Sequence, residues 1–381
     1  MSLRWLSMRV VFLVLLLAHA TATADPTKQR AIGEGLSFAI DARTGLHVVK
    51  GTKRAKLVDA SSIRTVAVDA AKRKVVVDVD DYSCVGNTKH TWTFGHLEAR
   101  VENWTAYGLA QTKNYKGAVA GFEKAVKFDP TWQIAAYNLA SAHQLAGDKL
   151  AAVAALAPWL ASHPIATYVQ VTTDPDLAPL LDRPELAAIR AKQAGNVKVT
   201  EKGFDPLYSK ERQLVAITMH TSQLVSGRSQ ITVEIYDART GGPVARLPLV
   251  RLGDTIPNDG RLTTTGKTTA VSRSVRLQTM LADLGFSAAK FEKAPTNDDD
   301  RAKVRVVFPK AKLGIVAVGG VANALRGNQR VGTVNLSGEL RSAVFVEDAS
   351  VVVVATYNPF VSDSCDSGQS EDETVVMSIK P

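Results

Sequence analysis

Short stretches of alternating hydrophobic and polar residues dominate the chain between residues 25 and 98. Residues 36–40 and 46–49 lie on either side of an Asp-to-Gly turn, and residues 65–68 and 74–79 lie on either side of a second turn at residues 69–73. Alternation with a period of two places hydrophobic side chains on one face of a strand, and tight turns favour Asp and Gly. The pattern predicts two β-hairpins and a β-rich N-terminal region over residues 25–98.

Between residues 99 and 165 the alternation stops and an alanine-rich helical periodicity begins. Equivalent residues recur after 34 positions, as the pairs Ala106 and Ala140, Ala118 and Ala152, and Pro130 and Pro164. Small alanines let paired helices approach closely, Phe122 and Leu156 fill the space between them, and proline ends a helix. The spacing predicts two helical hairpins, and residues 174–194 predict one or two further helices that cap the last hairpin.

This 34-residue unit resembles the tetratricopeptide repeat (TPR), and the resemblance covers about two repeats at residues 99–166. It implies a groove that is lined by the first helix of each hairpin and binds a protein or peptide partner. The family's groove positions fall on Asn103, Tyr107, Gln111, Tyr137, Ser141 and Gln144. Tyrosine offers apolar area and a hydroxyl, while Gln and Asn satisfy an extended backbone. The alternative is that these residues pack against the β regions and the repeats act as a spacer.

After Gly195 the chain returns to alternating segments, interrupted by one amphipathic stretch at residues 274–284 that predicts a helix. We therefore expect an α+β protein. A TPR-like helical module with capping helices over residues 99–194 stands between the β-rich N-terminal region and a β-rich C-terminal domain over residues 200–381.

Residues 1–24 have the three parts of a secretory signal peptide. Arg4 and Arg9 precede an apolar core at residues 10–18, and Ala22 and Ala24 then supply the small residues of a cleavage site before Asp25. The alternative is an uncleaved N-terminal anchor. Cleavage predicts an exported protein, periplasmic or extracellular, with no integral membrane segment left in the mature chain.

The export signal changes what the net charge and the two cysteines indicate. The formal net charge is +9, which in a cytosolic protein points to nucleic acid, but export argues against a nucleic-acid partner. Cys84 and Cys365 are the only cysteines. An oxidising compartment predicts a disulfide between them, which would tie the N-terminal region to the C-terminus. The alternative is two separate thiols.

Signatures of catalysis and cofactor binding are missing from the sequence. We find no GxSxG nucleophile elbow, no HExxH zinc motif, no Walker A loop and no GxGxxG fingerprint, and the two cysteines are not a close pair. We therefore predict no catalytic residues, no metal and no cofactor. The alternatives are a serine triad whose members lie far apart in the sequence and a nonstandard calcium site in the acidic segment at residues 363–368.

Three functions remain as hypotheses. The first is an exported, non-catalytic TPR adaptor or scaffold of the bacterial envelope that binds a protein partner. The alternative is a secreted hydrolase or ligand-binding protein whose active domain is residues 200–381. The third is a purely structural component of the envelope.

Overall fold

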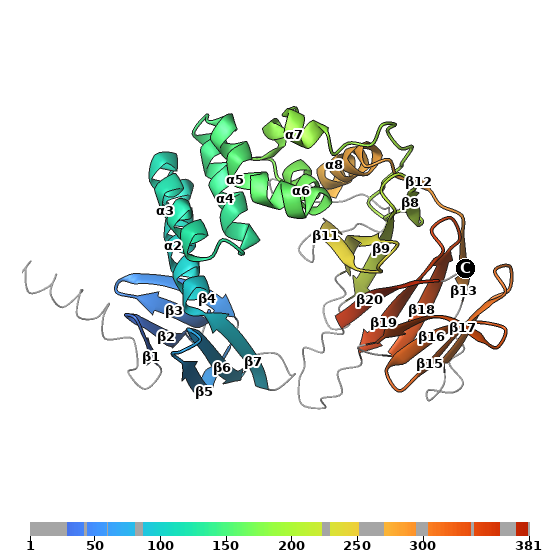
Figure 1. Cartoon of the computed structure of the whole chain (residues 1–381), viewed down its shortest axis with the longest axis horizontal. Helices are drawn as coiled ribbons and strands as arrows, with labels where there is room; N and C mark the ends of the chain where they lie inside the picture. Colours follow the sequence, from blue (N-terminus) through green and yellow to red (C-terminus); the bar gives the residue numbers. More distant parts are fainter. Residues whose placement is uncertain are drawn as a thin grey trace, which may run out of the picture. The chain divides into compact units, whose positions relative to one another are not determined.

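A computed structural model shows strands at both ends of the chain and helices in the middle (Figure 1), which confirms the α+β prediction. It describes residues 29–41, 44–58, 60–80, 87–222, 229–250, 270–294, 304–336, 339–358 and 371–379. The predicted signal peptide, Cys84 and Cys365 lie outside these residues. Two compact units divide the chain, Met1–Leu156 and Ala157–Pro381. Among the described helices, none has the length and apolar character needed to span a bilayer.

Two antiparallel sheets and the start of a helix form the core of the N-terminal unit. The first sheet is a meander of β1 (Gln29–Gly33), β2 (Leu36–Asp41), β3 (Gly45–Lys50) and β4 (Lys53–Val58). The second joins β5 (Ser62–Asp69), β6 (Lys74–Asp80) and β7 (Asn87–Thr93). Inward-facing residues of both sheets, such as Phe38, Val48 and Val77, share one hydrophobic cluster and are fully buried, as the alternation predicts.

Helix α2 (Phe94–Gln111) begins before the predicted boundary at residue 99. The hydroxyl of Thr93 caps it by accepting a hydrogen bond from the backbone N–H of His96 at 3.0 Å. Its first turns belong to the β core, because Phe94, Leu97 and Val101 pack into the same cluster as the strands. The sheets and the helical segment are therefore joined without a linker.

Three further helices follow in antiparallel succession: α3 (Tyr115–Phe128), α4 (Gln133–Leu145) and α5 (Lys149–Ser162). Helices α3 and α5 begin and end at equivalent positions of the repeat, and α2 and α4 also end at equivalent positions. The crossing of α2 and α3 is close, since a Cβ atom built on Gly121 would lie 2.7 Å from the Cβ of Ala106. Ala118 and Phe122 are buried at this crossing, as the repeat predicts.

The C-terminal unit begins with helices that pack on its own core. They are α6 (Pro164–Thr173), the short η2 (Ala178–Leu180) and α7 (Pro184–Ala187), and α6 packs against α8 (Ala270–Asp283) and an edge strand. The boundary between the two units at residues 156 and 157 thus divides the segment 99–194 that the sequence treats as one module. Pro164, expected to end a helix, also occupies the first turn of α6.

Three antiparallel sheets complete the C-terminal unit. Their strand orders are β11-β10-β9-β8-β12, β13-β18-β19-β20 and β14-β15-β16-β17. The first contains β8 (Leu207–Ser209), β9 (Leu214–Ser222), β10 (Ser229–Asp237), β11 (Pro243–Val250) and β12 (Ser287–Ala288). The second contains β13 (Phe291–Ala294), β18 (Glu339–Val346), β19 (Val351–Asn358) and β20 (Glu371–Ser378). The third contains β14 (Val304–Phe308), β15 (Leu313–Val318), β16 (Val321–Arg326) and β17 (Gln329–Asn335).

The sheet around β19 is covered on both faces. Val352 and Val354 pack toward the sheet of β14 to β17, whereas Val351 and Val353 pack toward β9 and β10. All four valines are buried. A strand with two buried faces has an uninterrupted apolar run in place of alternation, which explains the sequence Val-Val-Val-Val at this point.

Candidate functional site

The six predicted groove residues separate into three classes of exposure. Tyr107 and Gln111 are exposed, and Ser141 and Gln144 are partly exposed. Asn103 and Tyr137 are each only 8% exposed. The structure therefore does not bring the six residues together on one open surface.

The two buried residues occupy equivalent positions of the repeat, and both make contacts inside the helical segment. The Nδ2 atom of Asn138 on α4 donates to Oδ1 of Asn103 on α2 at 2.9 Å. The hydroxyl of Tyr137 accepts a hydrogen bond from Nε2 of Gln133 at 2.6 Å. Buried polar groups need such partners. Asn103 thus fixes the position of α4 relative to α2, and Tyr137 is part of the packed interior.

The open surface lies on a neighbouring face of the same helices. On α2, Trp104 is 55% exposed and Tyr107 is 46% exposed, and their rings stack with centroids 6.0 Å apart and planes at 24°. Gln111 lies one turn further along. On α4 the exposed hydrophobic residues are Ile134, at 52%, and Leu145. We call this surface the α2/α4 face and define it by Trp104, Tyr107, Gln111, Ile134, Ser141 and Leu145.

Sequence reasoning did not single out Trp104, Ile134 or Leu145. The available signal was the helical spacing of Trp104, Tyr107 and Gln111, which places three large side chains on one face of α2. Ser141 and Leu145 occupy, in the second repeat, the positions that Tyr107 and Gln111 occupy in the first.

Gln144, next to the α2/α4 face, carries an unused acceptor. Its Oε1 atom is buried and has no hydrogen-bond partner within the described part of the chain. A buried amide oxygen without a donor is energetically unfavourable.

The ionic groups next to α2 are largely paired. Lys53 Nζ contacts Glu102 Oε1 at 2.7 Å, and Lys50 Nζ forms an ion pair with Glu98. The guanidinium of Arg100 donates to the carbonyl of Lys56 at 2.7 Å. These contacts attach α2 to β3 and β4. The chemistry that the α2/α4 face offers to a partner is therefore mainly aromatic and apolar.

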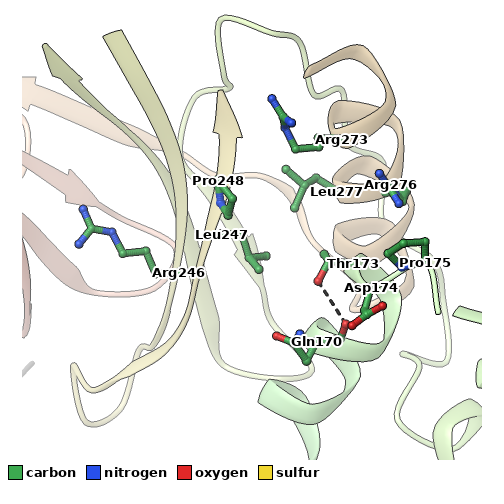
Figure 2. Close-up of a pocket in the computed structure, with 10 residues that line it drawn as sticks. All are labelled: Gln170, Thr173, Asp174, Pro175, Arg246, Leu247, Pro248, Arg273, Arg276 and Leu277. Atoms are coloured by element: carbon green, nitrogen blue, oxygen red, sulfur yellow. Dashed lines mark hydrogen bonds between the residues drawn. The ribbon is translucent and has the colours of Figure 1, made fainter. Parts of the chain in front are cut away.

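A separate cavity of about 360 Å³ lies in the C-terminal unit. Its walls are the end of α6, the edge strand β11 and helix α8, as Figure 2 shows. The lining residues are Gln170, Thr173, Asp174, Pro175, Arg246, Leu247, Pro248, Arg273, Arg276 and Leu277. Residues from the segment 170–175 thus contribute to the cavity. They lie outside residues 200–381, the domain in which we expected the alternative function of hydrolysis or ligand binding.

The arginines of this cavity differ in their contacts. Arg246 Nε lies 3.0 Å from Glu234 Oε1, and its side chain points away from α8 in Figure 2. Arg273 is buried, and its Nε donates to the carbonyl of Leu249 at 2.9 Å. Arg276 makes no hydrogen bond or ion pair with the described residues.

Asp174 is the one acidic residue of the described lining. Burial raises the pKa of its carboxyl group, and the positive charge of Arg276 opposes this rise. The two side chains therefore influence each other electrostatically without a direct hydrogen bond.

The described lining of the cavity holds no Ser, Cys or His side chain. The hydroxyl of Thr173 donates to the carbonyl of Val169 at 2.8 Å, within its own helix. Among the described residues, no group of three or more His, Cys, Asp or Glu side chains is placed to hold a metal ion.

Comparison of the chain with models of protein families, with curated proteins and with solved structures finds no match, so the function must be argued from these residues.

Proposed function

We propose that this protein is an exported, non-catalytic TPR-like adaptor of the bacterial envelope that binds a protein partner through the α2/α4 face. The observation that carries the proposal is the exposed, stacked pair Trp104 and Tyr107. Tryptophan and tyrosine are enriched among the residues that dominate interface energetics. The recurrence of helix ends at the repeat interval supports the resemblance to the repeat family.

The α2/α4 face suits a partner segment that presents a hydrophobic side chain. The rings of Trp104 and Tyr107 already hold each other, which lowers the entropy lost when a partner covers them. Gln111 and Gln144 offer amide groups that can pair with the partner's backbone. Because the nearby ionic groups are paired internally, we expect the affinity to depend weakly on salt.

Capture of a partner and measurement of its affinity tests this proposal. Residues 25–381 serve as bait for an envelope fraction, and the captured partner is then purified and titrated by calorimetry. The change Trp104→Ala with Tyr107→Ala should weaken binding at least about 30-fold, because removal of a central aromatic residue typically costs about 2 kcal/mol or more.

A matched control removes exposed apolar side chains elsewhere in the same unit. Val68→Ala with Leu150→Ala alters an exposed strand residue and a helix α5 residue that is 69% exposed, and should leave the affinity unchanged. Equal affinities of both double variants would contradict the proposal. If Asn103→Ala alone abolished binding while its thermal unfolding stayed unchanged, the groove predicted from the sequence would be the binding surface.

Export and the disulfide are part of the same proposal. Mass spectrometry of the mature protein should give a chain that begins at Asp25, because Ala22 and Ala24 form the cleavage site. A peptide that contains both Cys84 and Cys365 should be present without reductant and absent with it. A mature chain that retains residues 1–24 would exclude cleavage.

A second candidate function, ligand binding by the C-terminal unit, is favoured by the cavity between α6, β11 and α8. A volume of about 360 Å³ falls within the roughly 300–1,000 Å³ of small-molecule sites.

A further inference from the structure

We propose that the cavity between α6, β11 and α8 binds a small amphipathic anion, a molecule with a carboxylate-type head and an apolar body. All its described lining residues lie in the C-terminal unit. The proposal is therefore independent of the α2/α4 face, and either one can fail without the other.

The apolar body has a place between the strand and the helix. Figure 2 shows Leu247 on β11 and Leu277 on α8 facing each other across the cavity, with Pro248 beside them. Proline has no backbone N–H, so Pro248 offers this wall no donor. Each methylene group that a ligand transfers from water to such a surface should tighten binding roughly fourfold.

The charged head has a place on α8. Arg273 and Arg276 are three positions apart, so they project from one side of the helix. The bond from Arg273 Nε to the carbonyl of Leu249 fixes the first guanidinium at the cavity. Arg276 lacks a hydrogen-bond partner in the described part of the chain. Guanidinium groups bind carboxylates through paired N–H donors, which makes Arg276 the group with donors left for a ligand.

The balance of charge favours an anion over a cation. Arg246 is compensated by Glu234 at 3.0 Å. Among the described residues, the remaining lining carries two arginines and one carboxylate, Asp174. Oδ1 of Asp174 already accepts the backbone N–H of Asp176 at 2.9 Å. The described lining of the cavity therefore keeps an excess of positive charge.

Three probes with one tail and different heads test the proposal on the mature chain. The fluorescent dye 1-anilinonaphthalene-8-sulfonate, itself an amphipathic anion, is bound first and then displaced by octanoate, octanol or octylamine. We expect octanoate to displace the dye at a concentration at least tenfold lower than octanol, and octylamine to be the weakest competitor.

Single substitutions then locate the effect. Arg276→Gln should weaken octanoate about tenfold and leave octanol unchanged, because only the head group loses a partner. Asp174→Asn should strengthen octanoate, which keeps the proposal falsifiable if Arg276→Gln unfolds. Lys210→Gln removes an exposed positive charge on the turn between β8 and β9 and should change neither probe.

Each other result overturns the proposal. Equal displacement by octanoate and octanol means an apolar cavity without an anion site. Stronger displacement by octylamine means that Asp174 selects a cation. No displacement by octanoate, or an unchanged octanoate affinity in both Arg276→Gln and Asp174→Asn, means that the charged side chains of the cavity bind no such anion.

Discussion

The hydroxyl of Tyr168 joins three segments of the C-terminal unit, and its removal should loosen them together. Tyr168 on α6 is fully buried. Its hydroxyl donates to Oδ2 of Asp283 on α8 at 2.7 Å and accepts from Nε of Arg190 at 3.3 Å. Burial, assisted by the bond to Asp283, raises the pKa of Tyr168 to about 12, so the hydroxyl stays protonated as a donor at neutral pH.

The expected cost of Tyr168→Phe follows from these contacts. A hydrogen bond to a charged group contributes about 1.5–3 kcal/mol. We use the lower half of this range, because the Asp283 side chain is partly exposed and, in Tyr168→Phe, still has the guanidinium of Arg190, whose Nε lies 3.8 Å from its Oδ2, as an ionic partner. A loss of about 1.5–2 kcal/mol corresponds to a roughly 10- to 30-fold rise in the opening equilibrium. The ring itself remains, so no cavity is created.

Amide hydrogen exchange measures this locally, which matters because a chain with two compact units need not unfold in one step. Peptides from α6 and α8 should exchange roughly 10 to 30 times faster in Tyr168→Phe, while peptides from α3 are unchanged. Tyr115→Phe, on α3, removes a hydroxyl that makes no hydrogen bond with the described residues, and should alter no peptide.

Two results would refute this reasoning. One is an increase of less than threefold in α6 and α8. The other comes from the double-mutant cycle with Asp283→Asn: if the effects of the two changes simply add, the bond between the hydroxyl and the carboxylate contributes nothing. We expect a coupling free energy of at least about 1 kcal/mol.

Three further predictions concern the N-terminal unit. Burial lowers the pKa of His47 to about 4, below the pKa of a histidine in the unfolded chain, so a fall in pH protonates the unfolded chain before the folded one. Urea unfolding should therefore show up to about 2 kcal/mol less stability at pH 5 than at pH 7. The variant His47→Asn should lose most of this dependence of stability on pH. Leu97→Ala removes a fully buried side chain of α2 and should lower the unfolding free energy by about 2–5 kcal/mol; under the same urea titration the exposed Leu150→Ala should change it by less than about 0.5 kcal/mol. Gly121→Ala should lower the melting temperature despite the better helix propensity of alanine, because its Cβ would lie 2.7 Å from Ala106 Cβ; Ala106→Gly should restore it.

The sequence predicted the strands and helices whose hydrophobic periodicity depends only on residues close by in the chain. Alternation predicted the hairpins of β2 with β3 and of β5 with β6, and in β2 and β6 the buried residues alternate with partly exposed ones. The repeat interval predicted two helical hairpins in which Ala118 and Ala152 let the paired helices approach closely. Both alanines are fully buried.

The exact ends of the helices and strands, and the order in which the sheets stack, were harder to predict from the sequence. The first turn of α2 reads as part of a β-rich region, and only its contact with both sheets shows why Phe94 and Leu97 are apolar. The four valines at residues 351–354 carry no periodicity, so their sequence is compatible with a strand or a buried helix. Burial of both faces between two other sheets resolves the ambiguity.

The chain's local chemistry therefore defines its strands, its helical hairpins and the residue types available for binding. It does not define which of those residues face outward. Asn103 and Tyr107 lie one turn apart on α2, yet the crossing with α4 buries the first and leaves the second exposed. The cavity depends still more on tertiary contacts, because Asp174, Leu247 and Arg276 are far apart along the chain. No periodicity links such residues; they meet because α6 and α8 pack together beside the edge strand β11.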